Sequence, residues 1–190
     1  MGVAERKVRE RATREGRITA AARAIAANEG WSAVTIRRLA EEIEYSQPVL
    51  YSHFENRDAI VAAIAVEGFR ELAAALAEAA HLSDDRRTAL CNVATAYLAF
   101  TCEHPALYEA MFTMPSGLRF ADADTKPELR AAFAALAAVV TPSGNGDEVA
   151  TETFWAALHG LAELERSGRI RRNARDERVA LVVDGFFMVR

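Results

Sequence analysis

The chain has 190 residues, of which 51% are hydrophobic and 26% are charged, a balance typical of globular rather than disordered proteins. Its longest uninterrupted apolar run, residues 131–140, is shorter than the roughly 20 residues that a membrane-spanning helix needs. The net charge of −4 is uneven, because residues 1–60 hold 10 Lys and Arg against 9 Asp and Glu, whereas the remainder hold 13 against 18. We therefore expect a cytoplasmic protein without membrane contact, whose N-terminal end is suited to phosphates.

Apolar residues recur with helical spacing and no segment alternates with a period of two, so we predict an all-α protein. The first helix is expected at residues 7–29, with a stripe that includes Ile18 and Ile25, and it should end at Gly30. After the short helices described next, further helices are expected at 57–80, 83–102, 104–114, 125–141, 147–167 and 174–189. Residues 116–124 are interpreted as a loop and 143–146 as a linker.

Residues 35–54 predict two short helices joined by a tight turn. Thr35 stands at the N-cap position of the first helix, and Ser46 opens the second, with Pro48 tolerated in its first turn. The second helix should direct Leu50 and Phe54 inward. Its expected outward residues are Gln47, Val49, Ser52 and His53. The pattern is that of a helix-turn-helix, whose second helix can enter the DNA major groove.

The first 70 residues resemble the DNA-binding domain of the TetR family of bacterial transcription regulators. The most specific part is the run Leu50-Tyr51-Ser52-His53-Phe54, followed by Asn56-Arg57-Asp58. The C-terminal half is similar to a branch of the family with a Trp-x3-His-Gly signature, here residues 155–160. In the turn, Glu44 stands where the family usually has glycine. A left-handed backbone at this residue would cost about 1 kcal/mol.

The resemblance implies a helix-turn-helix domain at residues 1–56 and a helical domain for ligand binding and dimerisation at 57–190. Gln47, Val49 and Ser52 would then face base edges, Pro48 would make an apolar contact such as one to a thymine methyl, and Arg37 could reach a guanine. Residues expected to contact phosphates are Thr35, Tyr51, His53 and Arg57. The expected partner is a double-stranded, pseudo-palindromic DNA operator, with the protein acting as a repressor.

Large flexible and aromatic side chains are concentrated in the middle and C-terminal regions, which favours an apolar pocket for an unknown small-molecule effector. The residues expected to line it are Tyr97, Phe100, Tyr108, Met111, Phe112, Phe120, Trp155 and His159. The last two helices are expected to form the interface of a homodimer. The apolar stripes in question are Phe154, Leu158, Leu161 and Leu164, and Val179, Val182, Val183, Phe186 and Phe187. An internal core face is the alternative for both stripes.

Two other functions compete with this interpretation. A DNA-binding regulator without an effector would have the same N-terminal features, its C-terminal domain serving assembly alone. A helical enzyme is disfavoured, since Glu78-x-x-His81 occurs once whereas a di-iron bundle needs two such motifs with further carboxylates. We expect no cofactor and no metal. Cys91 and Cys102 lie too far apart on one helix for a disulfide, and both are expected to be buried.

Overall fold

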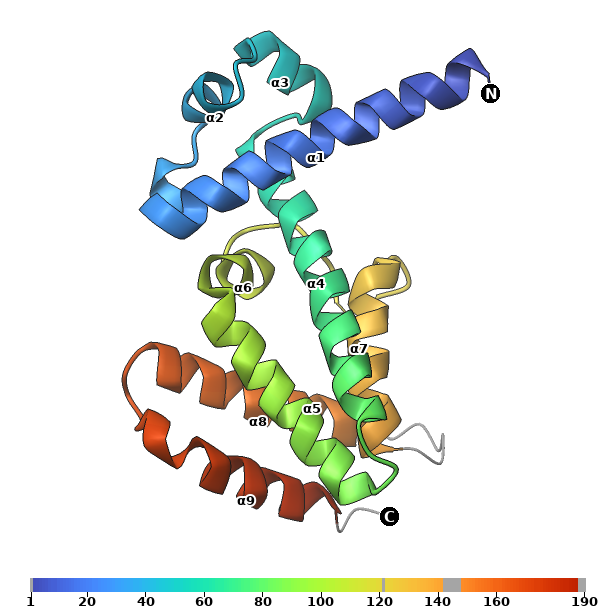
Figure 1. The fold of residues 1–190 in the computed structure, drawn as a ribbon, viewed down its shortest axis with the longest axis vertical. Coiled ribbons are helices and arrows are strands. Elements are labelled where there is room, and N and C mark those ends of the chain that lie inside the picture. The colour runs from blue at the N-terminus through green and yellow to red at the C-terminus, as the bar shows by residue number, and fades with distance from the viewer. Residues whose placement is uncertain (1, 121, 142–147, 188–190) are drawn as a thin grey trace. The chain divides into compact units, whose positions relative to one another are not determined.

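In a computed structural model, residues 2–120, 122–141 and 148–187 are described, and helices dominate them with no strand (Figure 1). The α-helices, in chain order, are α1 (Val3–Glu29), α2 (Ile36–Glu42), α3 (Gln47–His53), α4 (Arg57–His81), α5 (Arg86–Glu103), α6 (Pro105–Phe112), α7 (Pro127–Val140), α8 (Glu148–Arg166) and α9 (Arg175–Phe187). Two short 3-10 helices are η1 (Trp31–Ala33) and η2 (Arg172–Ala174). The all-α prediction is confirmed. The predicted linker at 143–146 lies outside the described residues.

The chain divides into two compact units, one formed by residues 1–68 and 105–118, the other by residues 69–104 and 119–190. Helix α4 runs from the first unit into the second. The functional division after residue 56 stays a prediction. Among the described helices, none combines the length and apolar character that crossing a membrane would require.

Helix α1 organises the first unit, in which α2, α3, η1 and α6 all contact it. Ile18 and Ile25 of α1 are buried, as the predicted stripe requires. Helix α6 packs closely on α4 because Gly68 has no side chain: a Cβ there would lie 2.6 Å from the sulfur of Met111. The indole nitrogen of Trp31 also donates a hydrogen bond of 2.8 Å to the carbonyl of Ala106, at the start of α6. The helix-turn-helix therefore shares its unit with α6.

Side-chain caps fix the starts of α2, α4 and α5, of which α5 begins at Arg86 rather than at the predicted residue 83. Thr35 accepts a hydrogen bond from the amide of Arg38 at 3.1 Å. Asn56 accepts one from Ala59 at 2.8 Å, and Asp85 accepts one from Thr88 at 2.9 Å.

Helix α1 begins at Val3 rather than at residue 7. The Gly2 amide donates to the Glu5 carboxylate at 2.9 Å, which caps the helix before any core contact exists. Ion pairs at i, i+4 spacing, Arg6–Glu10 at 3.6 Å and Arg11–Glu15 at 2.7 Å, support the exposed turns. Hydrophobic periodicity cannot reveal such turns.

In the second unit, α5 contacts α7, α8 and α9, and aromatic and aliphatic side chains fill the space between them. Four residues that the sequence assigned to the dimer face are buried within the unit: Phe154, Leu158, Val179 and Val183. The dimer assignment of these four is therefore wrong, because α8 and α9 each turn one apolar face toward their own chain. The apolar residues that stay largely exposed on these helices include Leu164 and Leu181.

A buried carboxylate joins the ends of α8 and α9. The side chain of Glu165 is 2% exposed and pairs with Arg175 at 2.5 Å and with Arg178 at 2.8 Å. Arg175 also donates to the sulfur of Cys102 at 3.1 Å. Cys102 is exposed and Cys91 is half-buried, so the expectation that both are buried is wrong. Both lie on α5, as predicted.

Candidate DNA-binding surface and effector site

Helix α3 presents an outer face of polar and apolar residues that the described residues of its unit leave exposed. Its exposed residues are Gln47, Pro48, Val49, Tyr51 and Ser52. Val49 is 37% exposed and Tyr51 is 53% exposed, whereas Leu50 is fully buried and anchors the helix. The orientation of these residues agrees with the sequence prediction. Exposed apolar and aromatic side chains on a short helix indicate a surface built for an external partner.

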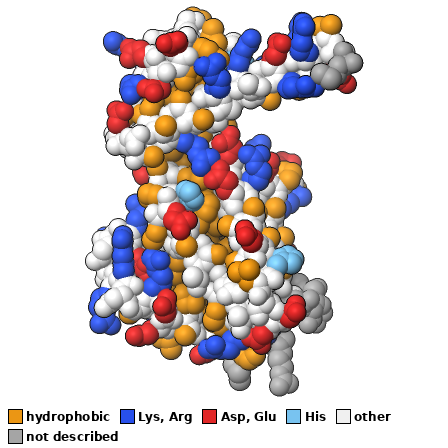
Figure 2. Space-filling view, viewed as in Figure 1, with side chains coloured by type: hydrophobic (Ala, Val, Ile, Leu, Met, Phe, Trp, Pro, Cys, Tyr) orange, Lys and Arg blue, Asp and Glu red, His pale blue; other side chains and the backbone are white. Residues whose placement is uncertain are grey.

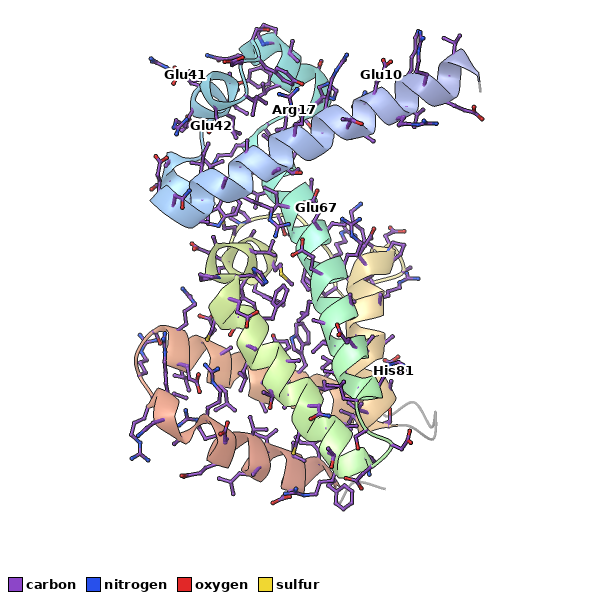
Figure 3. All side chains as sticks on the ribbon, viewed as in Figure 1. Glu10, Arg17, Glu41, Glu42, Glu67 and His81 are labelled. Atoms are coloured by element: carbon purple, nitrogen blue, oxygen red, sulfur yellow. The ribbon has the colours of Figure 1, made fainter. Side chains whose placement is uncertain are left out.

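The turn between α2 and α3 is held against α1. Glu44 has φ of 57°, so a non-glycine residue adopts the left-handed conformation at the position where the family usually has glycine. The next amide, that of Tyr45, bonds the carbonyl of Ala40 at 3.0 Å. Arg17 of α1 donates to the Tyr45 hydroxyl at 3.0 Å, from the side of α1 that faces the turn (Figure 3). These contacts fix the angle at which α3 leaves the turn.

Arg37 and Arg38, on the exposed side of α2, are both paired with carboxylates. Arg37 donates to Glu41 at 2.9 Å, which raises the pKa of the guanidinium, and Arg38 pairs with Glu42 and Glu29. Figure 3 shows Glu41 and Glu42 on α2. A base contact by Arg37 would therefore require it to leave Glu41, which lowers the net gain from that contact.

His53 and Arg57 lie differently from the sequence prediction. The side chain of His53 is only 6% exposed, with Nδ1 3.5 Å from the Glu15 carboxylate of α1, so the expectation that it faces outward is wrong. Arg57 donates to the carbonyls of Trp31 and Val34, both at 2.7 Å. Its guanidinium thus joins the start of α4 to the η1 segment. A local motif cannot reveal such partners, because they lie 23 and 26 residues away.

The predicted effector residues are divided between the two units. Tyr108, Met111 and Phe112 belong to α6 in the first unit, and the other five belong to the second. The four most deeply buried are Tyr97, Phe100, Tyr108 and Met111.

Within the second unit, a row of rings passes from Phe69 to Phe120 (centroids 5.5 Å apart), to Trp155 (6.3 Å) and to His159 (6.5 Å). The Trp155 indole donates to the Tyr97 hydroxyl at 3.1 Å. We call Phe69, Phe120, Trp155 and His159 the aromatic row. Phe69 was not among the residues expected to line a pocket, and it is buried while its ring contacts Phe120.

The imidazole of His159 lies one helical turn before Glu163 on α8. Burial lowers the pKa of His159, and the nearby Glu163 carboxylate opposes that shift only partly. The ring is therefore biased toward its neutral form, which can both donate and accept a hydrogen bond. Within the described part of the chain, no group of three or more His, Cys, Asp or Glu side chains is placed to hold a metal ion.

A chain with an exposed helix-turn-helix in one unit and a second, separate helical unit has the architecture of a bacterial DNA-binding transcription regulator. Residues 18–64 match the family of bacterial regulatory proteins called the tetR family, and residues 90–186 match the tetracyclin repressor-like C-terminal domain. The chain belongs to the TetR family.

Named relatives agree with this assignment. An HTH-type transcriptional regulator of Mycobacterium tuberculosis, itself uncharacterised, is 31% identical over 145 residues; the match spans 74% of this chain and 64% of that one. A protein of unknown function from Rhodococcus sp. RHA1 is 26% identical, with a TM-score of 0.74 over 91% of this chain and 93% of that one. A TetR variant from Acinetobacter baumannii, solved in complex with minocycline, is 21% identical, with a TM-score of 0.63 over 92% and 97%. The family consists of regulators, which agrees with the prediction that the chain is no enzyme.

Proposed function

We propose that the protein is a transcriptional repressor that binds a pseudo-palindromic operator as a dimer and is released from it by a small effector. The observation that carries the DNA-binding part is the exposed face of α3, mounted on a unit whose turn and caps are fixed by hydrogen bonds. A recognition helix of seven residues spans about 10 Å, enough for its N-terminal residues to meet base edges in one major groove.

The exposed residues divide by chemistry. Gln47 and Ser52 carry hydrogen-bonding groups, and Val49 with Pro48 supplies apolar contacts, so these four are proposed to face bases. Arg37 is proposed as a further base contact, which requires its guanidinium to leave Glu41 and bind a guanine. Thr35 and Tyr51 are proposed to bind phosphates. His53 and Arg57 are proposed to act chiefly by positioning α3 and the start of α4, since their side chains are engaged within the unit.

A dimer is proposed because one helix-turn-helix reads too few bases for tight specific binding. The surface left for it on α8 and α9 comprises Leu161 and Leu164 with Gly160, and Leu181 with Gly185. A Cβ built on either glycine meets nothing within 4 Å, although glycine inside a helix costs about 1 kcal/mol relative to alanine. Small residues beside exposed leucines would let a second copy's helices approach closely.

The aromatic row is the proposed effector site. Phe120 is 43% exposed while its ring contacts Phe69 and Trp155, so a ligand could meet an aromatic surface that already exists. The half-buried, neutral-biased His159 offers one polar contact at its end. An apolar or aromatic effector with one hydrogen-bonding group fits these features. It would act by binding more tightly to a conformation whose two α3 helices no longer match the operator spacing.

A regulator without an effector is the second candidate. It is favoured by the hydrogen bond between Trp155 and Tyr97, because two polar groups expected to meet a ligand satisfy each other. Tryptophan fluorescence separates the two candidates. The chain contains two tryptophans, so the measurement uses a Trp31→Phe variant in which Trp155 is the remaining one. If no compound in a panel of aromatic and fatty-acyl molecules changes its emission or releases DNA, the second candidate is favoured.

The DNA-binding proposal is tested by selecting duplexes from a library with a random 30-base-pair core and measuring affinity against salt. Binding should weaken steeply with salt, as phosphate contacts require. Gln47→Ala should reduce the preference for the selected duplex over a scrambled one. The control Leu82→Ala, in the segment between α4 and α5 and outside the proposed dimer surface, should leave that preference unchanged. A chain that binds no selected duplex, or binds all with salt-independent affinity, would refute the proposal.

A further inference from the structure

The first turns of α1 make no contact with the core. Every residue from Val3 to Arg14 is exposed, including Val8 at 70%, and this part of the helix projects past α3 within the first unit (Figure 1). Twelve residues correspond to about 18 Å of helix. An unpacked helix of this length is marginal in water, so its regular structure depends on the Gly2 cap and on i, i+4 ion pairs.

The projecting part continues the buried stripe of α1 with basic residues. Ile18 and Ile25, seven residues apart, face the core. Going toward the N-terminus in steps of four, three and four residues, the same stripe carries Arg14, Arg11 and Lys7. The side of the helix that is apolar where it meets the core is therefore cationic where the core ends. We call Lys7, Arg11 and Arg14 the basic stripe. Figure 2 shows Lys and Arg side chains along this projection.

The charges of the basic stripe are only partly neutralised. The side chains of Lys7 and Arg14 form no hydrogen bond or ion pair with the described part of the chain, whereas Arg11 pairs with Glu15 at 2.7 Å. Beside the stripe, Arg6 forms an ion pair with Glu10 at 3.6 Å, so its charge is partly neutralised. Two free cations one heptad apart, about 10 Å along the axis, can meet phosphates of one strand.

Two contacts near the inner end of the projecting part of α1 connect it to α3 and to the turn before α3. The carboxylate of Glu15 approaches His53 of α3, and Arg17 holds the α2–α3 turn through Tyr45. The basic stripe thus begins where α1 lies beside the helix-turn-helix. When α3 lies in the major groove, the DNA would continue past the projecting part of α1. Its phosphates would be exposed there.

We infer that the basic stripe binds the phosphates of DNA flanking the half-site that α3 reads, extending each subunit's contact by about five base pairs. The inference rests on the proposed DNA binding. Contacts to phosphates add affinity without reading sequence, so the flanks would contribute whatever their base composition.

The test uses the full chain and a selected duplex in two lengths, one trimmed to the protected core and one carrying eight further base pairs on each side. The variant Lys7→Gln/Arg14→Gln removes the two unpaired cations. The matched control Arg169→Gln/Arg172→Gln removes two exposed arginines of the second unit and changes the net charge equally. Circular dichroism and thermal melting verify that both variants stay folded.

We expect the stripe variant to bind the long duplex at least on the order of tenfold more weakly. The slope of log affinity against log salt should fall by about 3.6, because the dimer loses two phosphate contacts in each subunit. On the trimmed duplex the variant should match the unaltered chain, and the control should match it on both. Equal affinity of the variant for the long duplex, or an equal loss in the control, would overturn the inference while leaving the proposed function intact. A loss of dimer mass in the stripe variant would also overturn it, because the stripe would then serve protein contact. Failure of the unaltered chain to bind either duplex would instead refute the proposed function.

Discussion

At the residue scale, Glu44 holds a backbone conformation that its side chain does not favour, with φ of 57° in the turn before α3. We predict that Glu44→Gly raises the free energy of unfolding by about 0.5–1 kcal/mol, since glycine adopts this conformation freely but loses more entropy on folding. Urea unfolding monitored by circular dichroism measures the change. The control Glu41→Gly, inside α2, should lower stability by about 1 kcal/mol. A stabilising effect at both positions would show that strain at residue 44 is not the cause.

Arg57 offers a choice between two roles, a phosphate contact and a structural one. Because its guanidinium donates to two carbonyls of the η1 segment, we predict that Arg57→Ala lowers the free energy of unfolding by about 2 kcal/mol. Arg57→Lys should restore little, since an ammonium cannot reproduce the planar fork. Chemical denaturation provides the measurement. If stability is unchanged and DNA binding is weaker, Arg57 contacts a phosphate instead of serving a structural role.

His159 gives the second unit a pH dependence of definite sign. Because burial lowers its pKa in the folded state, the unfolded chain takes up the proton first as pH falls below about 6.5. Stability should therefore decrease as pH falls from that value to the lowered pKa, and no further below it on account of this residue. We predict that His159→Gln flattens unfolding midpoints across this window. Glu163, whose pKa lies below its usual range through its hydrogen bond with Arg166, acts only at lower pH.

At the element scale, the α8–α9 connection depends on one carboxylate. Burial opposes the ionisation of Glu165, yet hydrogen bonds from Arg175 and Arg178 outweigh it and hold the pKa of the carboxyl below its usual range. We predict that Glu165→Ala lowers the free energy of unfolding by about 3 kcal/mol, because two partly buried guanidinium groups lose their partner. Glu163→Ala, which breaks the more exposed pair with Arg166, should cost less than about 1 kcal/mol. Similar losses from both variants would contradict the special role of Glu165.

The sequence was sufficient to predict helices and their caps, because both depend on neighbours within a turn or two. Thr35 caps α2 as the sequence predicted, and Asn56 and Asp85 cap α4 and α5 in the same local way. The resemblance pointed to Glu44 as the residue on which any left-handed turn conformation would fall, and its φ is 57°.

Which surface covers an apolar stripe depends on distant residues, and there the sequence failed. Phe154 and Leu158 belong to the core rather than to a dimer face, and His53 turns toward α1. A helical period identifies a face but not its neighbour. For the same reason the association of α6 with the first unit was unpredictable, since it requires Gly68 and Trp31 to meet residues about 40 and 75 positions away.

At the scale of the whole molecule, the proposed operator binding depends on dimerisation, because one recognition helix reads too few bases. Leu181, on α9, is 74% exposed. Leu82, in the segment between α4 and α5, is 73% exposed. The two therefore form a matched pair, of which only Leu181 lies on the proposed dimer surface. We predict that the chain sediments at micromolar concentration with about twice its mass of 20.8 kDa, and that Leu181→Glu shifts it to the monomer. A charge there would be buried without a partner in the dimer but solvated in the monomer.

Leu82→Glu should leave the dimer intact, because it adds the same charge at the same exposure outside that surface. Loss of the dimer should also weaken operator binding. Each half-site would then have to be occupied independently, so the gain from binding two linked half-sites would be lost. The Leu181→Glu monomer should therefore keep its weak affinity for a single half-site duplex while losing the gain from a second half-site. A Leu181→Glu protein that remains dimeric would place the dimer interface elsewhere than on α9. Dissociation by Leu82→Glu would move that interface to the α4–α5 connection.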